Sequence, residues 1–210
     1  MLKMIEHLSE KYPGCAWEFV SRKPARTVFR LVRQGAAEYY VKLYDTRGLR
    51  ERLKSLLRPK IPHEAFMLWL LGMSGIPAAK VREHLRLPGA DAIVTDAVPE
   101  ASGLPASSRD RQVEVMLDLG LTLINHGYHF SDLHPRNIVL DAAGLPHLVD
   151  AYGIRPCRRI TLENAASLFA QVARHFGLSE HDLHQHLVRI DAIRDVGMLK
   201  KRIRRLCLAA

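Results

Sequence analysis

The sequence lacks any apolar run of about 18 residues, the length that a membrane-spanning helix needs. Its first residues, Met-Leu-Lys-Met-Ile-Glu-His, also lack the long apolar region and the small-residue cleavage site of a signal peptide. The three cysteines, Cys15, Cys157 and Cys207, lie far apart without zinc-ligand spacing, so we expect reduced thiols. Together these absences predict a cytoplasmic chain.

Internal repeats and the aromatic-rich signatures of RNA-binding modules are missing too. The formal net charge of +9 nevertheless favours an anionic partner, such as a nucleic acid, an acidic lipid or a phosphorylated saccharide. Because no motif supports nucleic-acid binding, we expect no nucleic-acid partner and keep a basic nucleic-acid binder as an alternative. With 48% hydrophobic and 25% charged residues, the 210 residues predict a globular chain of one domain or two small lobes sharing a cleft.

Acidic and amide side chains flank two short apolar segments between Phe130 and Gly153. Asp132 and Asn137 precede Ile-Val-Leu, and Asp150 follows His-Leu-Val after a polar turn. A hairpin of two such strands can direct all three side chains into one cleft. Phosphoryl transfer needs a base that orients a hydroxyl and oxygen ligands for Mg²⁺, which these residue types supply. The alternative is a surface hairpin with incidental Asp and Asn residues.

The spacing of these residues resembles that of the protein-kinase-like superfamily. Asn137 lies five residues after Asp132, as in the catalytic loop, and Gly153 lies three residues after Asp150, one more than in the Asp-Phe-Gly segment. The resemblance implies that Asp132 is the catalytic base and that Asn137 and Asp150 are magnesium ligands. Two positions depart from the protein-kinase pattern: Phe130 replaces a histidine, and Ala-Tyr replaces the phenylalanine of Asp-Phe-Gly.

Three β-rich runs, at residues 17–20, 27–33 and 38–44, predict an antiparallel meander. Lys42 lies inside the third run, where a lysine is costly unless it has an anionic partner. A helix is expected to begin at Pro62 and to carry Glu64 in its first turn. The resemblance implies that Lys42 contacts the nucleotide phosphates and pairs with Glu64. Alternatively, the lysine points to solvent from an edge strand, and the glutamate is favoured by its own helix dipole.

The loop expected between the first two strands, Ser21-Arg-Lys-Pro-Ala-Arg26, contains no glycine. A typical protein kinase has a glycine-rich loop here, whose backbone amides hold the phosphates. Arg22, Lys23 and Arg26 could supply positive charge in its place. The missing glycines weaken the protein-kinase hypothesis and leave open an inactive binding protein built on a kinase fold.

Two further strands are expected at residues 80–87 and 92–96, joined through the turn dipeptide Pro88-Gly89. Residues 97–103 lose this periodicity and gain proline and glycine, which is typical of a linker between lobes. A helical pattern at residues 108–126, ended by Gly127, leads into the catalytic loop. By resemblance, adenine would meet backbone groups near Asp96, Ala97 and Val98.

Helices are expected at residues 162–176, 180–190 and 192–206. The segment 154–160 before them is too short for peptide recognition and has no Ala-Pro-Glu element, which indicates a non-protein acceptor. His134, two residues after Asp132, matches the small-molecule and sugar kinases of the superfamily.

Basic amphipathic helical patterns occur at residues 45–60 and 198–208. The first could recognise an anionic acceptor and the second could lie on an anionic membrane surface. Equally, each could be a solvated face.

We therefore expect an α+β, two-lobed protein-kinase-like fold. Residues 1–98 form a small antiparallel sheet lobe with one main helix, and residues 99–210 form a mainly helical lobe with the catalytic hairpin. The features most resemble bacterial lipopolysaccharide core kinases, which phosphorylate heptose or Kdo. The resemblance implies ATP and Mg²⁺ as cofactors, an anionic lipid-linked saccharide acceptor, and a peripheral contact with the inner face of the inner membrane. A protein or small-molecule acceptor remains an alternative.

Overall fold

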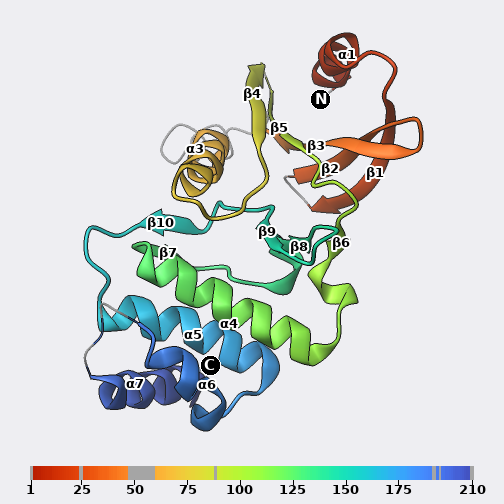
Figure 1. The fold of residues 1–210 in the computed structure, drawn as a ribbon. Coiled ribbons are helices and arrows are strands. Elements are labelled where there is room, and N and C mark those ends of the chain that lie inside the picture. The colour runs from red at the N-terminus through yellow and green to blue at the C-terminus, as the bar shows by residue number, and fades with distance from the viewer. Residues whose placement is uncertain are drawn as a thin grey trace.

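The computed structural model describes residues 2–23, 26–46, 60–87, 89–190, 193 and 195–208. A β-rich lobe with helices α1 and α3 lies above a mainly helical lobe, and the chain between them forms short strands (Figure 1). The predicted α+β fold class is confirmed. The basic helix expected at residues 45–60 falls mainly on residues 47–59, which lie outside the described residues.

A five-stranded antiparallel sheet forms the first lobe, in the order β1-β2-β3-β5-β4. The predicted meander of the first three strands is present, and β5 inserts between β3 and β4. The turn between β2 and β3 has positive φ angles at Gln34 and Gly35, as a tight hairpin requires. The strands are β1 (Ala16–Lys23), β2 (Arg26–Arg33), β3 (Ala36–Asp45), β4 (Val81–Leu87) and β5 (Ala90–Asp96).

Of the helices that the structure describes, α1 and α3 pack against this sheet. Helix α1 (Leu2–Lys11) buries Met4 and Leu8 in a cluster with Leu31 and Val41 of the sheet. Helix α3 (Lys60–Met73) packs against β4 and β5 and contributes to the second, larger core cluster, which extends into the other lobe. Helix α1 therefore packs on the sheet through the smaller cluster. Helix α3 connects the sheet to the helical lobe through the larger cluster.

Short strands between the lobes hold the hairpin that carries the candidate site residues. Strands β6 (Ser102–Gly103), β8 (Ile138–Leu140) and β9 (Pro146–Leu148) form one small sheet, and β7 (Tyr128–Phe130) pairs with β10 (Ile154–Pro156) in another. Two 3-10 turns, η1 (Leu104–Ala106) and η2 (Pro135–Asn137), flank them. The loop between β7 and β8 therefore starts and ends on paired strands, which fix its position.

Among the described residues, four helices build the other lobe. The hydroxyls of Ser108, Thr161 and Ser179 cap α4, α5 and α6, the last two in complete capping boxes. Helix α4 approaches α5 so closely that a Cβ added at Gly120 would lie 2.7 Å from Leu168 Cδ2. The helices are α4 (Arg109–Asn125), α5 (Leu162–Phe176), α6 (Glu180–Leu187) and α7 (Val196–Leu208).

The apolar side of the basic helix α7 is occupied. Leu199 and Ile203 are buried, α7 packs against α5, and Arg202 pairs with Glu163 of α5 at 2.8 Å. Of the two roles expected for this segment, the contacts match a helix that caps the lobe with a solvated outer face. In the part of the chain that the structure describes, no helix is both long and apolar enough to cross a membrane.

Candidate active site

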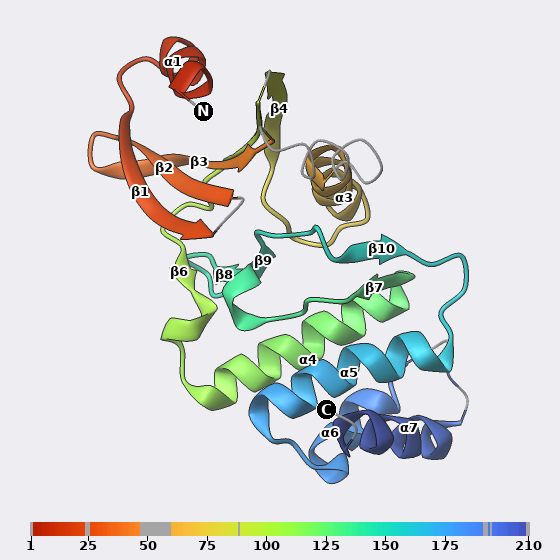
Figure 2. The same cartoon turned by 180° about the vertical axis from the view of Figure 1, so that it is seen from behind.

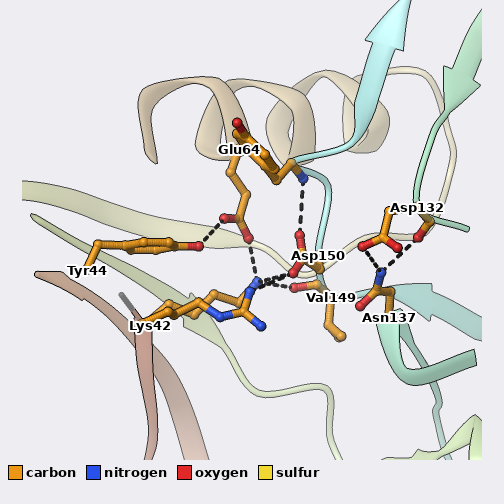
Figure 3. Close-up of polar contacts among 9 residues, drawn as sticks. Lys42, Tyr44, Glu64, Asp132, Asn137, Val149 and Asp150 are labelled. Atoms are coloured by element: carbon orange, nitrogen blue, oxygen red, sulfur yellow. Dashed lines mark hydrogen bonds and ion pairs between the residues drawn. The ribbon is translucent and has the colours of Figure 1, made fainter. Parts of the chain in front are cut away.

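A buried ion pair joins the sheet to helix α3. Lys42 of β3 is 8% exposed and Glu64 of α3 is fully buried, and their charged groups are in contact (Figure 3). Tyr44 lies two residues from Lys42, on the same side of the strand, and its hydroxyl donates to Glu64 Oε2 at 3.1 Å. Burial, with a contribution from the Glu64 charge, raises the pKa of Tyr44, so the hydroxyl stays protonated and remains a donor.

Asp150 lies at the other end of this chain of contacts. Lys42 Nζ donates to the backbone carbonyl of Val149 at 2.8 Å and lies 3.8 Å from Asp150 Oδ2. Arg26 Nη1 donates to the same carboxylate oxygen at 2.9 Å. Burial alone would raise the pKa of Asp150, but the Lys42 and Arg26 cations outweigh burial and lower it. Asp150 is therefore an ionised carboxylate that faces two cations.

Asp132 and Asn137 are joined within the loop from β7 to β8. Asn137 Nδ2 donates to the backbone carbonyl of Asp132 at 2.9 Å and approaches its Oδ2 at 3.4 Å (Figure 3). The Val149 N–H donates to the Asn137 carbonyl at 2.9 Å, which ties this loop to the residue before Asp150. The side-chain nitrogen of Asn137 is the donor in both of these contacts. The amide oxygen takes part in neither, so it can face a cation.

Gly153 allows the segment after Asp150 to lie against the loop that carries Asp132. A Cβ at this position would lie 3.0 Å from Ser131 Oγ, 3.1 Å from Phe130 Cε2 and 3.2 Å from Asp132 Cβ. The Ser131 N–H donates to the Gly153 carbonyl at 3.0 Å. A larger residue would therefore push on Asp132 directly, which gives this glycine a physical role in the site.

A cleft of about 340 Å³ brings several predicted residues together. Lys42, Asn137 and Asp150 line it, and Glu64 and Asp132 contact these lining residues from either side. Its apolar walls come from both lobes, from Val20, Val28, Val98, Val139 and Val149. The size and mixed lining fit a ligand that has an apolar ring and charged groups.

The three residues expected at adenine are placed differently. Asp96 and Val98 line the cleft, whereas Ala97 is not among its lining residues. The Ala97 N–H donates to the carbonyl of Glu38 at 2.8 Å, so it is used by the neighbouring strand. The Asp96 N–H is used in the same way, by the carbonyl of Lys80 at 2.8 Å. The Val98 carbonyl accepts from the Ala101 N–H at 3.3 Å, so the backbone groups that we expect to face a ligand are the Asp96 carbonyl and the Val98 N–H.

The residues present fit a magnesium ion that is shared with a phosphate ligand. In the described ranges, no group of three or more His, Cys, Asp or Glu side chains could hold a metal alone. Asp150 offers a carboxylate and Asn137 an amide oxygen, both hard ligands of the kind Mg²⁺ prefers. Mg²⁺ commonly takes only one or two protein ligands and completes its shell with phosphates and water.

Two contacts in this site were not predicted from the sequence. Tyr44 carried a signal, since a tyrosine two residues from a buried lysine shares its side of the strand. Arg26 was expected only as a source of charge in the glycine-free loop, and its bond to Asp150 spans 124 residues. No sequence pattern near Arg26 indicates this partner.

The comparisons with known proteins find no matching family model and no matching curated protein. Solved structures do match. The chain superposes on WbdD, solved with a kinase inhibitor, with a TM-score of 0.57 and 16% identity, covering 90% of this chain and 45% of WbdD. It superposes on an aminoglycoside-3'-phosphotransferase of type VIII with a TM-score of 0.66 and 17% identity, covering 99% and 98%.

A third match is the aminoglycoside phosphotransferase APH(3'')-Id from Streptomyces rimosus, with a TM-score of 0.63, 14% identity and 98% coverage of both chains. The chain thus spans about 45% of the WbdD chain and nearly all of the two aminoglycoside phosphotransferases. At these identities the matches show the fold. It is the protein-kinase-like fold, as the motif around Asp132, Asn137 and Asp150 led us to expect.

Proposed function

We propose that the protein is an ATP-dependent phosphotransferase whose acceptor is a sugar hydroxyl of the lipopolysaccharide core. The observation that carries this proposal is the buried Lys42–Glu64 pair beside Asp150, in a cleft that Asn137 also lines. Burying a lysine and a glutamate together costs desolvation free energy. Such buried charged pairs are found at functional sites, where binding needs them. The arrangement is the one that phosphoryl transfer from a nucleotide requires.

The valine-lined part of the cleft would take the adenine ring, with the Asp96 carbonyl and the Val98 N–H at its edge. Lys42 would neutralise phosphate charge, and Glu64 with Tyr44 would hold the lysine in place. Asp150 and Asn137 would hold Mg²⁺, which compensates the charge of the transferred phosphoryl group when it is bound.

Asp132 would orient the acceptor hydroxyl and take its proton. Its side chain is exposed, so an acceptor can reach it, and the contact with Asn137 Nδ2 restrains its position. A carboxylate with this access and restraint suits a base that acts on an alcohol. The role is independent of Asp150, whose carboxylate faces Lys42 and Arg26.

The charges around Asp132 support an anionic acceptor. Burial lowers the pKa of His134, and His175, Arg136 and Lys23 lower it further while Asp132 raises it, so two cationic side chains, Arg136 and Lys23, lie within electrostatic reach of this histidine. His134 is two residues from Asp132. A phosphorylated core saccharide would be attracted here, whereas a polycationic aminoglycoside would be repelled.

A small-molecule acceptor is the second candidate, because both aminoglycoside phosphotransferases match this chain over 98% or more of its length. Incubation with labelled ATP, Mg²⁺ and either deacylated core oligosaccharide or an aminoglycoside separates the two candidates. We expect label in the oligosaccharide fraction only, and none with an Asp132→Ala variant. Label in the aminoglycoside alone would contradict the proposed acceptor. Magnesium-dependent nucleotide binding without transfer to any acceptor would instead indicate an inactive kinase fold.

A further inference from the structure

The outer face of helix α3 is apolar. Phe66, Trp69 and Met73 are 52%, 56% and 70% exposed, and their spacing of three and four residues places them in one stripe. The rings of Phe66 and Trp69 are neighbours, with centroids 5.9 Å apart. Single exposed apolar residues are common on protein surfaces, but a contiguous stripe marks a surface that contacts something else.

The inner face of α3 is apolar as well. Met67, Leu68 and Leu71 are buried in the core, and the one acidic residue of the helix, Glu64, is fully buried against Lys42. The exposed side of α3 therefore carries no acidic side chain. A helix that is hydrophobic all round is expected to be covered on both sides.

Strand β10 and its flanking residues lie next to α3 in both views (Figures 1 and 2). His63 Nε2 bonds to the carbonyl of Ile154 at 3.0 Å, and the His63 and Tyr152 rings meet edge to face with centroids 6.2 Å apart. Residues 151–160 contain no acidic side chain. Their exposed side chains include Tyr152, Arg155, Arg158 and Arg159.

The sequence that leads into α3 adds more positive charge. Its structure lies outside the described residues, but it contains five basic residues against one acidic residue, Glu51. The basic residues are Arg47, Arg50, Arg52, Lys54 and Arg58. In the described part of the chain, the helix that carries the exposed apolar stripe therefore contacts a segment whose exposed charged side chains are arginines.

We propose that this surface docks on an anionic lipid bilayer. The α3–β10 face is defined by Phe66, Trp69, Met73, Tyr152, Arg155, Arg158 and Arg159. Aromatic and apolar side chains that enter the headgroup region, flanked by arginines that meet anionic headgroups, are the two signals that peripheral membrane binding combines. Helix α7, the basic amphipathic helix for which a membrane contact was also considered, already buries its apolar side against α5.

The inference deepens the proposed function. Only the delivery of the cleft to a lipid-linked acceptor rests on that function. Helix α3 carries Glu64, and Tyr152 is two residues from Asp150, so the α3–β10 face is built on the same elements as the candidate active site. Docking there would bring the cleft to the surface in which a lipid-linked acceptor is anchored. The bilayer contact itself can be measured without nucleotide or acceptor.

The sequence has two tryptophans, Trp17 and Trp69, so a Trp17→Phe variant makes Trp69 the sole tryptophan, whose emission can be excited selectively. Trp17 packs edge to face on Phe29, a contact that phenylalanine can keep. We expect the Trp69 emission to shift to the blue with vesicles of phosphatidylcholine and phosphatidylglycerol, and to stay unchanged with phosphatidylcholine alone. Added salt should reverse the shift.

Vesicle sedimentation of variants then tests the residues. Trp69→Ser and Met73→Ser should weaken binding to the anionic vesicles, whereas Met198→Ser, which changes a methionine 57% exposed on α7, should not. Arg155→Gln and Arg158→Gln should each weaken binding about fivefold, from the contribution of one basic residue near an anionic surface. Thermal unfolding of each variant verifies that the fold is kept.

Four results would overturn the inference. These are no binding to anionic vesicles, equal loss in the Met198→Ser control, protection of Trp69 from acrylamide in the free protein, and a dimer in solution that Trp69→Ser dissociates. Protection would show that the chain itself covers the face, and a dimer that a second copy does. If the protein binds nucleotide but not vesicles, only the docking surface is rejected. If it binds vesicles but not nucleotide, only the proposed function is rejected.

Discussion

Replacing Lys42 by methionine should destabilise the protein strongly, because the buried Glu64 carboxylate loses its cation. The Glu64 side chain has no exposed surface, and besides Lys42 the Tyr44 hydroxyl contacts its carboxylate at 3.1 Å. Methionine has nearly the length of the lysine stem and keeps its apolar packing. The change therefore removes the charge while it conserves the volume.

Breaking a buried ion pair by removing one partner costs about 3–5 kcal/mol, since the remaining charge is desolvated without compensation. At about 2–4 °C per kcal/mol for a chain of this size, Lys42→Met should lower the Tm by about 10 °C. The double variant Lys42→Met with Glu64→Leu should recover most of this loss, because replacing both charges by apolar groups is often neutral.

Thermal and urea unfolding of the two single variants and the double variant give the coupling free energy. Arg30→Met is the matched control, since Arg30 pairs with Glu18 on the surface, where both side chains are more than 40% exposed. The control should stay close to the wild type. A Lys42→Met variant as stable as the control, or a double variant less stable than either single variant, would refute the argument from burial.

Three further substitutions test the candidate site and the pH dependence of stability. Gly153→Ala should destabilise by about 1–3 kcal/mol and lower activity, because its Cβ meets three neighbours within 3.2 Å, whereas Gly72→Ala, with nothing within 4 Å, should not destabilise in urea unfolding. Asp132→Ala should lower kcat at least about 100-fold with little change in the Kd of ATP, and an unchanged kcat would exclude a base role. Burial lowers the pKa of His129, so the free energy of unfolding should decrease as pH falls below about 6.5, and His129→Gln should reduce this slope; an unchanged slope would contradict the assignment.

The strands and helices could be predicted because their patterns are local. The meander, the helix after Ser108 and the capping box at Ser179 all depend on residues a few positions apart. The contact between Lys42 and Glu64 could also be expected, since a buried lysine needs an anion and Glu64 was the nearest candidate on the next helix.

Other features depend on long-range geometry or on the backbone. The insertion of β5 between β3 and β4 and the contact of Arg26 with Asp150 depend on the closed tertiary structure. Whether Ala97 can offer its N–H to a ligand is decided by its bond to the Glu38 carbonyl, and backbone bonds leave no mark in the side chains. The last helix begins at Val196, four residues later than its pattern predicted.

The central claim, that this cleft holds a nucleotide through Asp150 and a shared magnesium ion, is tested most directly by calorimetric titration with ATP, with and without Mg²⁺. The account predicts that wild-type binding strengthens when Mg²⁺ is added and that Asp150→Ala removes this dependence. The Asp150 carboxylate is ionised and lined up with Lys42 and Arg26 in the cleft. Failure of the wild type to bind ATP, or magnesium dependence that survives in Asp150→Ala, would contradict it.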